Sequence, residues 1–492
     1  MVSPDVPIYR PWIGHARAGH LSPRQRRPGL NMWEVVRSNT ASGRVFRGVA
    51  ANALGKLWVF AYQFLSIPVL VTKWGVAGYG IWLMLSAVPT YAVLSDFGFG
   101  AAARVDMTRR AERGDHAGAL NAFQSVWAFV SAISLFLLLA GTSVWLYCRG
   151  VGWLDGNRRE ILDAGYYLFL YSLIVVQMSV LTVAYQSVGR YAQGTFLFDI
   201  LSPFEGVALI IIAWKGGYFV AASLAMLGLR LVGFAIYYRA LRRAEPWITL
   251  GWRHATMAEL KALAKPALAA FTFPLSTALN IQGIFFLIGL VISPAATAMF
   301  GTVRMISRVP LQLVGLLSRA TLPEITMAHA RDDVRRMDRL VFANLGAVAV
   351  VSLPVAMLMA LLGQWVVELL TRGQIQPPIS LVLTMAGITV LQSYWNTIAT
   401  FLFALNLQER FSIMYLVLSS IAIALSYYLV SIWGILSVAL LMLAVDVIMA
   451  IRVTLAWHQV THSSWSTIIE IARQAPADLR LLWARYLRRA PQ

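Results

Sequence analysis

Long apolar runs alternate with short polar segments through most of this chain. Runs of roughly 20 residues recur from about residue 48 to residue 455, and that is the length an α-helix needs to cross a bilayer. Inside lipid every backbone polar group must be bonded within the protein, which a helix achieves by itself. The pattern predicts twelve transmembrane helices, at about 49–72, 79–103, 120–147, 161–185, 195–214, 218–238, 263–292, 295–318, 338–362, 379–403, 412–431 and 434–455.

Composition supports a membrane protein. Of the 492 residues, 59% are hydrophobic and 13% are charged, with a mean hydropathy of +0.66, whereas a soluble domain carries about 25% charged residues. The apolar runs are continuous, which argues against the alternating pattern of a membrane β-barrel. We therefore expect an all-α polytopic fold. Cys148 is the single cysteine, and all seven histidines fall in expected loops or tails, so no disulfide, metal site or cofactor is predicted.

The chain divides into five predicted parts. The first 47 residues are polar, lack the apolar core of a signal peptide and are expected to be disordered; Met32 is a second candidate start. The segment after Trp457 is too charged to span and is expected to lie on the inner leaflet. The parts are a cytoplasmic tail (1–47), an N-lobe of six spans (48–240), an inter-lobe loop (241–262), a C-lobe of six spans (263–455) and an amphipathic cytoplasmic tail (456–492).

The basic residues orient the predicted helices. Arginines crowd alternate connections, including 104–118, 239–262 and 319–337, while the opposite connections carry few. Cytoplasmic segments of membrane proteins are enriched in Lys and Arg, so both termini are predicted to be cytoplasmic. This bias and attraction to anionic lipid explain the net charge of +19, and nucleic-acid binding is not expected.

An internal repeat links the second and eighth spans. With a shift of 221 residues, "YGIWLMLSAVPTYAVL" (79–94) faces "FGTVRMISRVPLQLVG" (300–315). The Val-Pro pairs of these stretches coincide, and without gaps Arg110 meets Arg331. The repeat predicts two pseudo-symmetric six-helix lobes around a central cavity, the usual build of alternating-access transporters.

Two arginines stand inside the eighth span. Arg304 and Arg308 are four residues apart and share one helical face, and Arg304 lies about 14 Å along its span. A central arginine costs about 2.5–3.5 kcal/mol on insertion scales, so we expect both to face water or an anion. The structural alternative is pairing with carboxylates that also lie inside spans, namely Asp199, Glu205 and Asp446.

Three further charged residues lie in or beside the spans. Lys56, in the first span, either faces the same cavity or extends its ammonium group to the surface. Arg230, in the sixth span, is expected to be paired or to reach the surface. Asp96, in "LSDFGFG", either fixes the end of the second span or, like the three carboxylates named above, takes part in coupling. The adjacent glycines do not make a nucleotide site, since no strand precedes them.

One stretch of the chain is similar to a known family. "GYGIWLMLSAVPTYAVLSDFGFGAAARVDMTRRAERGD" (78–115) resembles the second-span signature of Wzx-type polysaccharide repeat-unit flippases. In that signature a "YG-W" start leads to "D-G-G" and then to a basic loop ending in Gly-Asp. "LPEITMAHARDD" (322–333) is similar to the matching stretch after the eighth span. The resemblance covers about 48–455 and places the chain near the multidrug/oligosaccharidyl-lipid/polysaccharide exporter superfamily.

The resemblance implies a function. Such a flippase moves an undecaprenyl-pyrophosphate-linked oligosaccharide across the bacterial inner membrane for O-antigen or exopolysaccharide biosynthesis. In this family spans 1, 2, 7 and 8 line the cavity, so Lys56, Arg304 and Arg308 are expected to bind the pyrophosphate, since guanidinium pairs well with phosphate oxygens. Membrane lipids, a polysaccharide polymerase and a chain-length regulator are further candidate partners.

Three other functions remain open. A cation-coupled multidrug antiporter has the same fold but needs cavity carboxylates, whereas the expected cavity spans are mainly basic. A lipid II flippase is a closer alternative, although it usually has two more spans. A membrane enzyme for the same polysaccharides needs a large extracytoplasmic loop, and the longest here, 148–160 and 363–378, are too short. No nucleophile–base arrangement is visible, so an enzyme is not expected.

Overall fold

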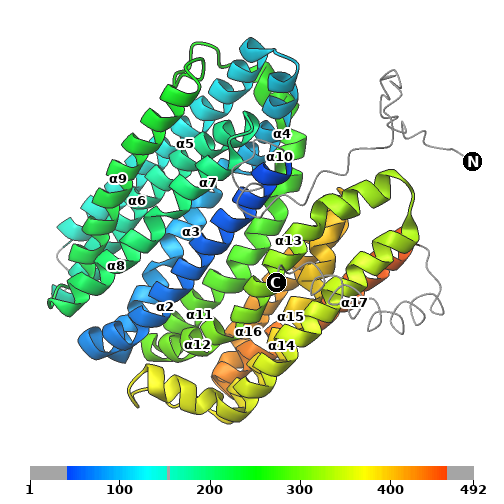
Figure 1. Cartoon of the computed structure of the whole chain (residues 1–492). Coiled ribbons are helices and arrows are strands. Elements are labelled where there is room, and N and C mark those ends of the chain that lie inside the picture. The colour runs from blue at the N-terminus through cyan, green and yellow to red at the C-terminus, as the bar shows by residue number, and fades with distance from the viewer. Residues whose placement is uncertain (1–40, 152–155, 462–492) are drawn as a thin grey trace, which may run out of the picture. The chain divides into compact units, whose positions relative to one another are not determined.

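The structure is a computed structural model that describes residues 41–151 and 156–461 (Figure 1). Side chains are described from Trp58 onward, apart from that of residue 60. The chain separates into two compact units, Met1–Arg47 and Gly48–Gln492, and the arrangement below concerns the second. Most of the N-terminal tail and the amphipathic helix expected after Trp457 lie outside the described residues, and the five-part division stays a prediction.

Every regular element in these ranges is helical. The first half of the chain contains α2 (Ala41–Leu85), α3 (Ala87–Val93), η1 (Leu94–Asp96), α4 (Phe99–Glu112), α5 (His116–Gly150), α6 (Gly156–Ser187), α7 (Tyr191–Asp199), α8 (Leu201–Trp214) and α9 (Phe219–Ala244). The second half contains α10 (Met257–Ala278), η2 (Leu279–Gly283), α11 (Ile284–Val291), α12 (Pro294–Ser307), α13 (Val309–Ala330), α14 (Val334–Leu370), α15 (Ile379–Ala404), α16 (Glu409–Trp433) and α17 (Ile435–Thr461).

These elements make twelve helical rods, as predicted. Gly75 adopts φ 73° and divides α2 into the first rod and the start of the second. Nine helical segments of the described chain are long and apolar enough to cross a membrane. The count falls short of twelve because the first two rods are merged and because α15 and the α12–α13 rod are not among the nine. The chain is therefore an all-α, multi-pass membrane protein of two six-rod lobes.

The internal repeat is visible at the bends of the second and eighth rods. The helix of the second rod is interrupted at Ser86 and resumes at Ala87; that of the eighth ends at Ser307 and resumes at Val309. The Ser86 hydroxyl donates to the carbonyl of Leu83 at 2.6 Å, and the Ser307 hydroxyl donates to that of Arg304 at 2.7 Å. The two serines are 221 positions apart, and so are the two residues whose carbonyls accept these hydrogen bonds.

The loops that follow these rods also match, but with a shift of 218. In 113–115 and in 331–333 the middle residue is left-handed, with φ 76° and 52°. The third residue is an aspartate whose Oδ1 accepts from the backbone N–H three residues on, Gly118 for Asp115 and Arg336 for Asp333. The similar stretch proposed from the sequence is thus the structural counterpart of the first motif.

The ungapped pairing of Arg110 with Arg331 is wrong. A shift of 218 makes Arg113 the counterpart of Arg331, because the second rod holds three more residues than the eighth after the shared bend. In the second rod, η1 and the left-handed pair Phe97 and Gly98 interrupt the helix a second time. A sequence repeat in apolar helices does not reveal where such an extra bend lies.

Three hydrophobic cores hold the helices together. We call the end of the bundle that carries connections 113–115, 188–190, 245–256, 331–333 and 405–408 the basic end. There, one core joins α4, α5, α6 and α9 to the start of α10, and a separate core joins α13 to α17. At the opposite end a single core contains residues of both lobes, including Trp82 and Phe300. Both lobes therefore contribute to the core at the opposite end, whereas at the basic end only the start of α10 joins the N-lobe core and α13 to α17 pack separately.

Close contacts fix the two lobes against each other at both ends. At the opposite end, a Cβ added to Gly80 would lie 1.7 Å from the carbonyl oxygen of Pro294. Near the basic end, Arg110 of α4 bonds Glu259 of α10 at 2.8 and 2.9 Å. The hydrogen bond to Glu259 raises the pKa of Arg110, against the lowering effect of burial. The second and seventh rods are thus joined by an ion pair as well as by packing.

Glycine at position 80 is expected to be essential for this packing. In Gly80→Ala the new methyl group would overlap backbone, which cannot move as a side chain can, so we expect a loss of about 1–3 kcal/mol in unfolding free energy. Gly228→Ala in α9 is the control, because no atom lies within 4 Å of its added Cβ and alanine favours a helix. Thermal unfolding of the purified proteins tests this, and equal midpoints for the two variants would contradict the close contact.

Candidate functional site: a cavity between the lobes

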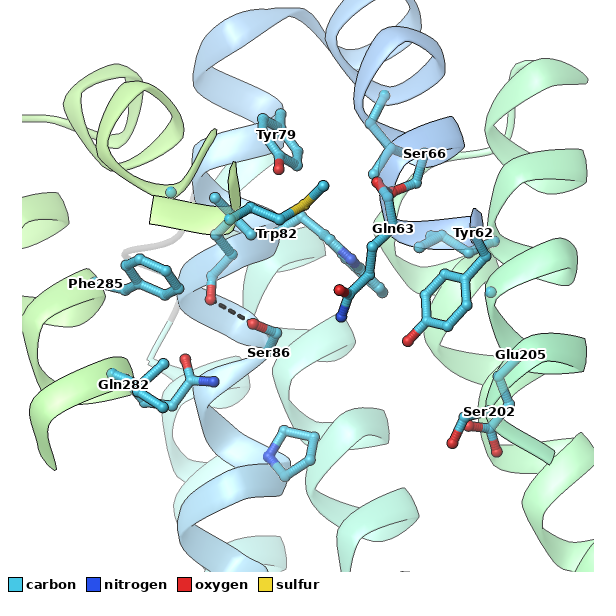
Figure 2. A pocket seen from close by; sticks show the side chains of 18 of the residues that line it. Tyr62, Gln63, Ser66, Tyr79, Trp82, Ser86, Ser202, Glu205, Gln282 and Phe285 are labelled. Atoms are coloured by element: carbon cyan, nitrogen blue, oxygen red, sulfur yellow. Dashed lines mark hydrogen bonds between the residues drawn. The ribbon is translucent and has the colours of Figure 1, made fainter. Parts of the chain in front are cut away.

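A cavity of about 370 Å³ lies between the two lobes, within the range of roughly 300–1,000 Å³ typical of ligand sites. The N-lobe contributes residues of α2, α3, α6, α8 and α9, and the C-lobe contributes residues of η2, α11, α12 and α13. Figure 2 shows Tyr62 and Gln63 of α2 projecting toward Trp82 and Ser86, with Gln282 on the other side of the space. We call this the central cavity.

A second cavity continues from the first. It has a volume of about 270 Å³ and lies in the C-lobe, between residues of α10, η2, α13, α15 and α16. Ile281, Arg308 and Gln312 line both cavities. The second cavity extends from the bend to Ser318 and Arg319 at the middle of α13 and to Thr400 near the end of α15, on the side of the basic end, so we call it the basic-end cavity.

Arg304 is held in the wall of the central cavity. Its side chain is buried, and one terminal nitrogen donates to the carbonyl and to Oδ1 of Asn280 at 3.1 and 2.9 Å. Asn280 lies in η2, a π-helical turn, and such turns are common at functional sites. The other terminal nitrogen contacts the sulfur of Met442 at 2.8 Å, while Nε has no partner in the described part of the chain.

Arg308 stands at the bend itself. It ends α12 and precedes α13, and it is the arginine that lines both cavities. Among the described side chains, neither Arg308 nor Arg304 forms an ion pair within 4 Å. A buried cation without a counter-ion is costly, so the pair favours the binding of an anion at this bend.

Asp446 lies behind Arg304 rather than in the cavity wall. Its side chain is buried in α17, and Oδ1 accepts from the indole N–H of Trp395 at 2.8 Å. Its charge acts on Arg304, but the two groups are not within 4 Å. The structural alternative of direct pairing is therefore not realised between Asp446 and either cavity arginine.

Glu205 has a different partner. It lies in α8, lines the central cavity and pairs with Arg230 of α9 at 2.7 Å, with both side chains at most 4% exposed. Tyr171 donates to the same carboxylate oxygen at 2.9 Å. The expectation that Arg230 is paired or reaches the surface thus resolves as pairing, and Glu205 is not the counter-ion of Arg304 or Arg308.

The remaining predicted site residues do not join this group. Asp96 Oδ1 accepts from the backbone N–H of Gly98 at 3.0 Å, at the bend before α4, and its side chain lines a separate cleft with Arg104. Asp199 ends α7 and is not part of either cavity wall. Lys56 lies within α2, but its side chain is outside the described ones. The roles of all three stay predictions.

Comparisons with known proteins give a family match. Residues 164–377, which extend from α6 into the connection after α14, match the family described as "Polysaccharide biosynthesis protein". A comparison with curated protein sequences found no match.

Solved structures show the same architecture. An inward-facing multidrug resistance MATE family transporter of the MOP superfamily superposes with a TM-score of 0.68 at 13% identity, covering 82% of this chain and 95% of that one. The MATE multidrug transporter DinF-BH, solved as a ligand complex, gives 0.66 at 15% identity, covering 86% and 97%. A MOP superfamily transporter from Pyrococcus furiosus gives 0.61 at 15% identity, covering 89% and 99%.

The chain has the MOP superfamily fold. Together with the family match, this confirms the resemblance to polysaccharide transporters that the second-span motif indicated. The MOP fold also accounts for the two lobes and for a cavity between them.

The sequence did not identify most of the polar and aromatic residues that line the central and basic-end cavities. Arg304 and Arg308 were found because a charge stands out in an apolar span. The others are uncharged and occur in every membrane helix, so only the fold shows which of them face the cavity; they include Tyr62, Gln63, Trp82, Gln282, Gln312 and Tyr415. The one sequence pattern that could have indicated these cavity residues is the recurrence of amide and hydroxyl side chains on a single face of one span.

Mutation of Arg230 is expected to lower stability strongly, whereas mutation of Arg308 is expected to change it little. Arg230→Met leaves the buried carboxylate of Glu205 without a counter-ion and should cost about 3–5 kcal/mol of unfolding free energy. The double variant Glu205→Gln, Arg230→Met should recover most of that loss. Arg308→Gln, at a guanidinium with no described bond, should change stability by about 0.5 kcal/mol or less.

Chemical unfolding of the purified variants measures these differences. The pairing in the N-lobe is contradicted if Arg230→Met is as stable as the parent protein. A severe loss in Arg308→Gln would instead assign that arginine a structural role.

Proposed function

We propose that this protein is a flippase for undecaprenyl-pyrophosphate-linked oligosaccharide repeat units in the synthesis of a surface polysaccharide, O-antigen or exopolysaccharide. It would move the cargo from the inner to the outer leaflet of the bacterial inner membrane by alternating access, without catalysing a chemical reaction. The cargo is the lipid-linked precursor, and no cofactor is required. The basic end, with both termini, would face the cytoplasm.

The observation that carries this proposal is the pair of cationic groups at the junction of two cavities. Arg304 and Arg308 line the central cavity, lack ion-pair partners within the described ranges, and lie on one rod of the C-lobe. A pyrophosphate supplies the missing negative charge, and its oxygens match the planar fork of N–H donors on guanidinium. Lys56, one or two turns from the N-lobe residues of the wall, is a further candidate for this group.

Access from the basic end supports the same function. The basic-end cavity leads from Arg308 toward the basic end, where α13 to α17 pack in a core apart from that of α4, α5, α6 and α9. A lipid-linked precursor assembled in the cytoplasm would enter from that side. Of the three structures compared above, the inward-facing transporter has the highest TM-score, which agrees with entry from the cytoplasmic side.

A cation-coupled drug antiporter is less well supported, although several of the similar structures are multidrug transporters. An organic cation needs a carboxylate that faces the cavity. Glu205 faces it, but Arg230 already neutralises its charge at 2.7 Å. The Pyrococcus furiosus transporter is described as having a binding pocket of reverse polarity and a different function, so the MOP fold does not require a cationic cargo. A lipid II flippase binds the same pyrophosphate and differs in the sugars.

Replacing the cavity arginines is expected to reduce flipping. Arg308→Gln removes a charge-assisted contact with the pyrophosphate, each of which contributes about 1.5–3 kcal/mol, so transport should fall by roughly tenfold to a hundredfold. Arg308→Lys should recover part of the rate, because it keeps the charge but loses the fork. Flipping of a polyprenyl-pyrophosphate disaccharide in reconstituted vesicles, normalised to folded protein, provides the measurement.

The matched control is Arg335→Gln, at an exposed arginine of α14 that lines neither cavity, which should leave flipping unchanged. Undiminished flipping by the double variant Arg304→Gln, Arg308→Gln would rule out the cavity role of both residues.

Loss of the protein is expected to interrupt polysaccharide assembly. A deletion strain should lack the surface polymer and collect lipid-linked repeat units on the cytoplasmic side, because synthesis continues while translocation stops. Extraction of the lipid-linked fraction, compared with a strain carrying the gene on a plasmid, tests this. Normal polymer with altered drug resistance would favour the antiporter instead.

A further inference from the structure

The two walls of the central cavity differ in charge. The C-lobe wall carries Arg304 and Arg308, whereas the N-lobe lining residues that the structure describes include no lysine or arginine. The N-lobe wall instead contains aromatic rings, amides and hydroxyls, with the ion-paired Glu205 as its single carboxylate. A ligand that fits both walls has an anionic end and a neutral, hydroxyl-rich end.

Two acceptor atoms in the cavity wall, one from each lobe, lack a hydrogen-bond donor among the described residues. One is Oε1 of Glu205, whose other oxygen binds Arg230 and Tyr171. The other is Oε1 of Gln282, on the facing η2 turn. Both atoms are buried in the wall of the cavity. A bare pyrophosphate has no hydrogen to donate to them, whereas sugar hydroxyls and N-acetyl groups do.

The aromatic ring of Tyr62 lies beside the first of these acceptors. A Cβ on Gly206 would lie 2.4 Å from the ring of Tyr62, so the absence of a side chain lets that ring pack directly on α8, next to Glu205. Figure 2 shows Gln63 reaching into the space between Tyr62 and Ser86, and Ser202 beside Glu205. An aromatic face bordered by amide and hydroxyl groups suits the C–H face and the hydroxyl rim of a pyranose ring.

We propose that the N-lobe wall, formed by Tyr62, Gln63, Ser202 and Glu205, binds the sugars of the cargo while the C-lobe arginines bind its pyrophosphate. This inference rests on the proposed function and extends it to a substrate class. An acidic sugar would bring a carboxylate, which has no hydrogen to donate, against the acceptor oxygens of Glu205 and Gln282 and would leave them without a donor. The sugars next to the pyrophosphate are therefore uncharged, such as hexoses or N-acetylhexosamines.

Binding of three probes to the purified full chain in lipid nanodiscs tests the proposal. The probes are a short polyprenyl pyrophosphate, the same lipid carrying a neutral disaccharide, and the same lipid carrying a disaccharide with one hexuronic acid. We expect the neutral disaccharide to tighten binding about tenfold over the bare lipid, the effect of one net hydrogen bond. The acidic disaccharide should give no such gain.

Variants assign the gain to the N-lobe wall. Tyr62→Leu and Gln63→Leu should each abolish it while the bare lipid binds as before. Arg308→Gln should weaken all three probes alike. The control is Tyr427→Leu, the same substitution at an exposed residue of α16 outside both cavities, which should keep the full gain. Two variants are used because Tyr62 also packs on α8, and binding is expressed per folded protein.

The outcomes separate this inference from the proposed function. If the bare lipid binds and weakens in Arg308→Gln, but the neutral disaccharide adds nothing in the parent protein, the N-lobe site is overturned alone. A gain that persists in Tyr62→Leu and Gln63→Leu also overturns it, as does tighter binding of the acidic disaccharide. If no pyrophosphate lipid binds the parent protein, the proposed function fails and this inference fails with it.

Discussion

The cost of a charge in lipid governs this structure. Arg304 and Arg308 can stay inside the eighth rod only because the fold surrounds them with protein and cavity rather than with acyl chains. A π-helical turn supplies Asn280 to one guanidinium, and a bend places the other at the junction of two cavities. The neighbouring carboxylates serve other partners: Glu205 holds Arg230, and Asp446 accepts from Trp395. The cavity therefore keeps an excess of positive charge.

The two lobes share a plan but not a chemistry. The bends of the second and eighth rods carry the same serine-to-carbonyl hydrogen bond, so the repeat fixes backbone shape. At the position that matches Arg304 the N-lobe has Leu83, and at that of Arg308 it has Ala87. The sixth and twelfth rods, α9 and α17, also correspond between the lobes. Arg230 of α9 and Asp446 of α17 each lie eleven residues after the start of their helix, but they carry opposite charges. Divergence of side chains on a repeated backbone produced a cavity with two unlike walls.

The fold could be predicted from the sequence further than the site could. Twelve apolar runs suffice for twelve rods because a bilayer leaves a hydrophobic segment few alternatives. Arg304 and Arg308 were also identifiable, since a charge in lipid requires an explanation. The sequence could not show which of several carboxylates inside the spans pairs with Arg230. Nor could it show that Tyr62 and Gln63 face the cavity, because the direction in which a side chain points depends on how the rods pack. The second interruption at Phe97 and Gly98 was hidden for the same reason, which led to the mistaken Arg110–Arg331 register.

The depth of Arg304 has an electrical consequence. It lies ten residues into α12, about 15 Å along the helix, and so near the middle of the hydrocarbon. If the basic end faces the cytoplasm, as proposed, an anion that reaches this point from inside has crossed roughly half of the membrane voltage. For two negative charges and an inside-negative potential of 100 mV, that half-crossing is favourable by about 2.3 kcal/mol. A resting cell would load such a site more fully than a depolarised one before any helix moved.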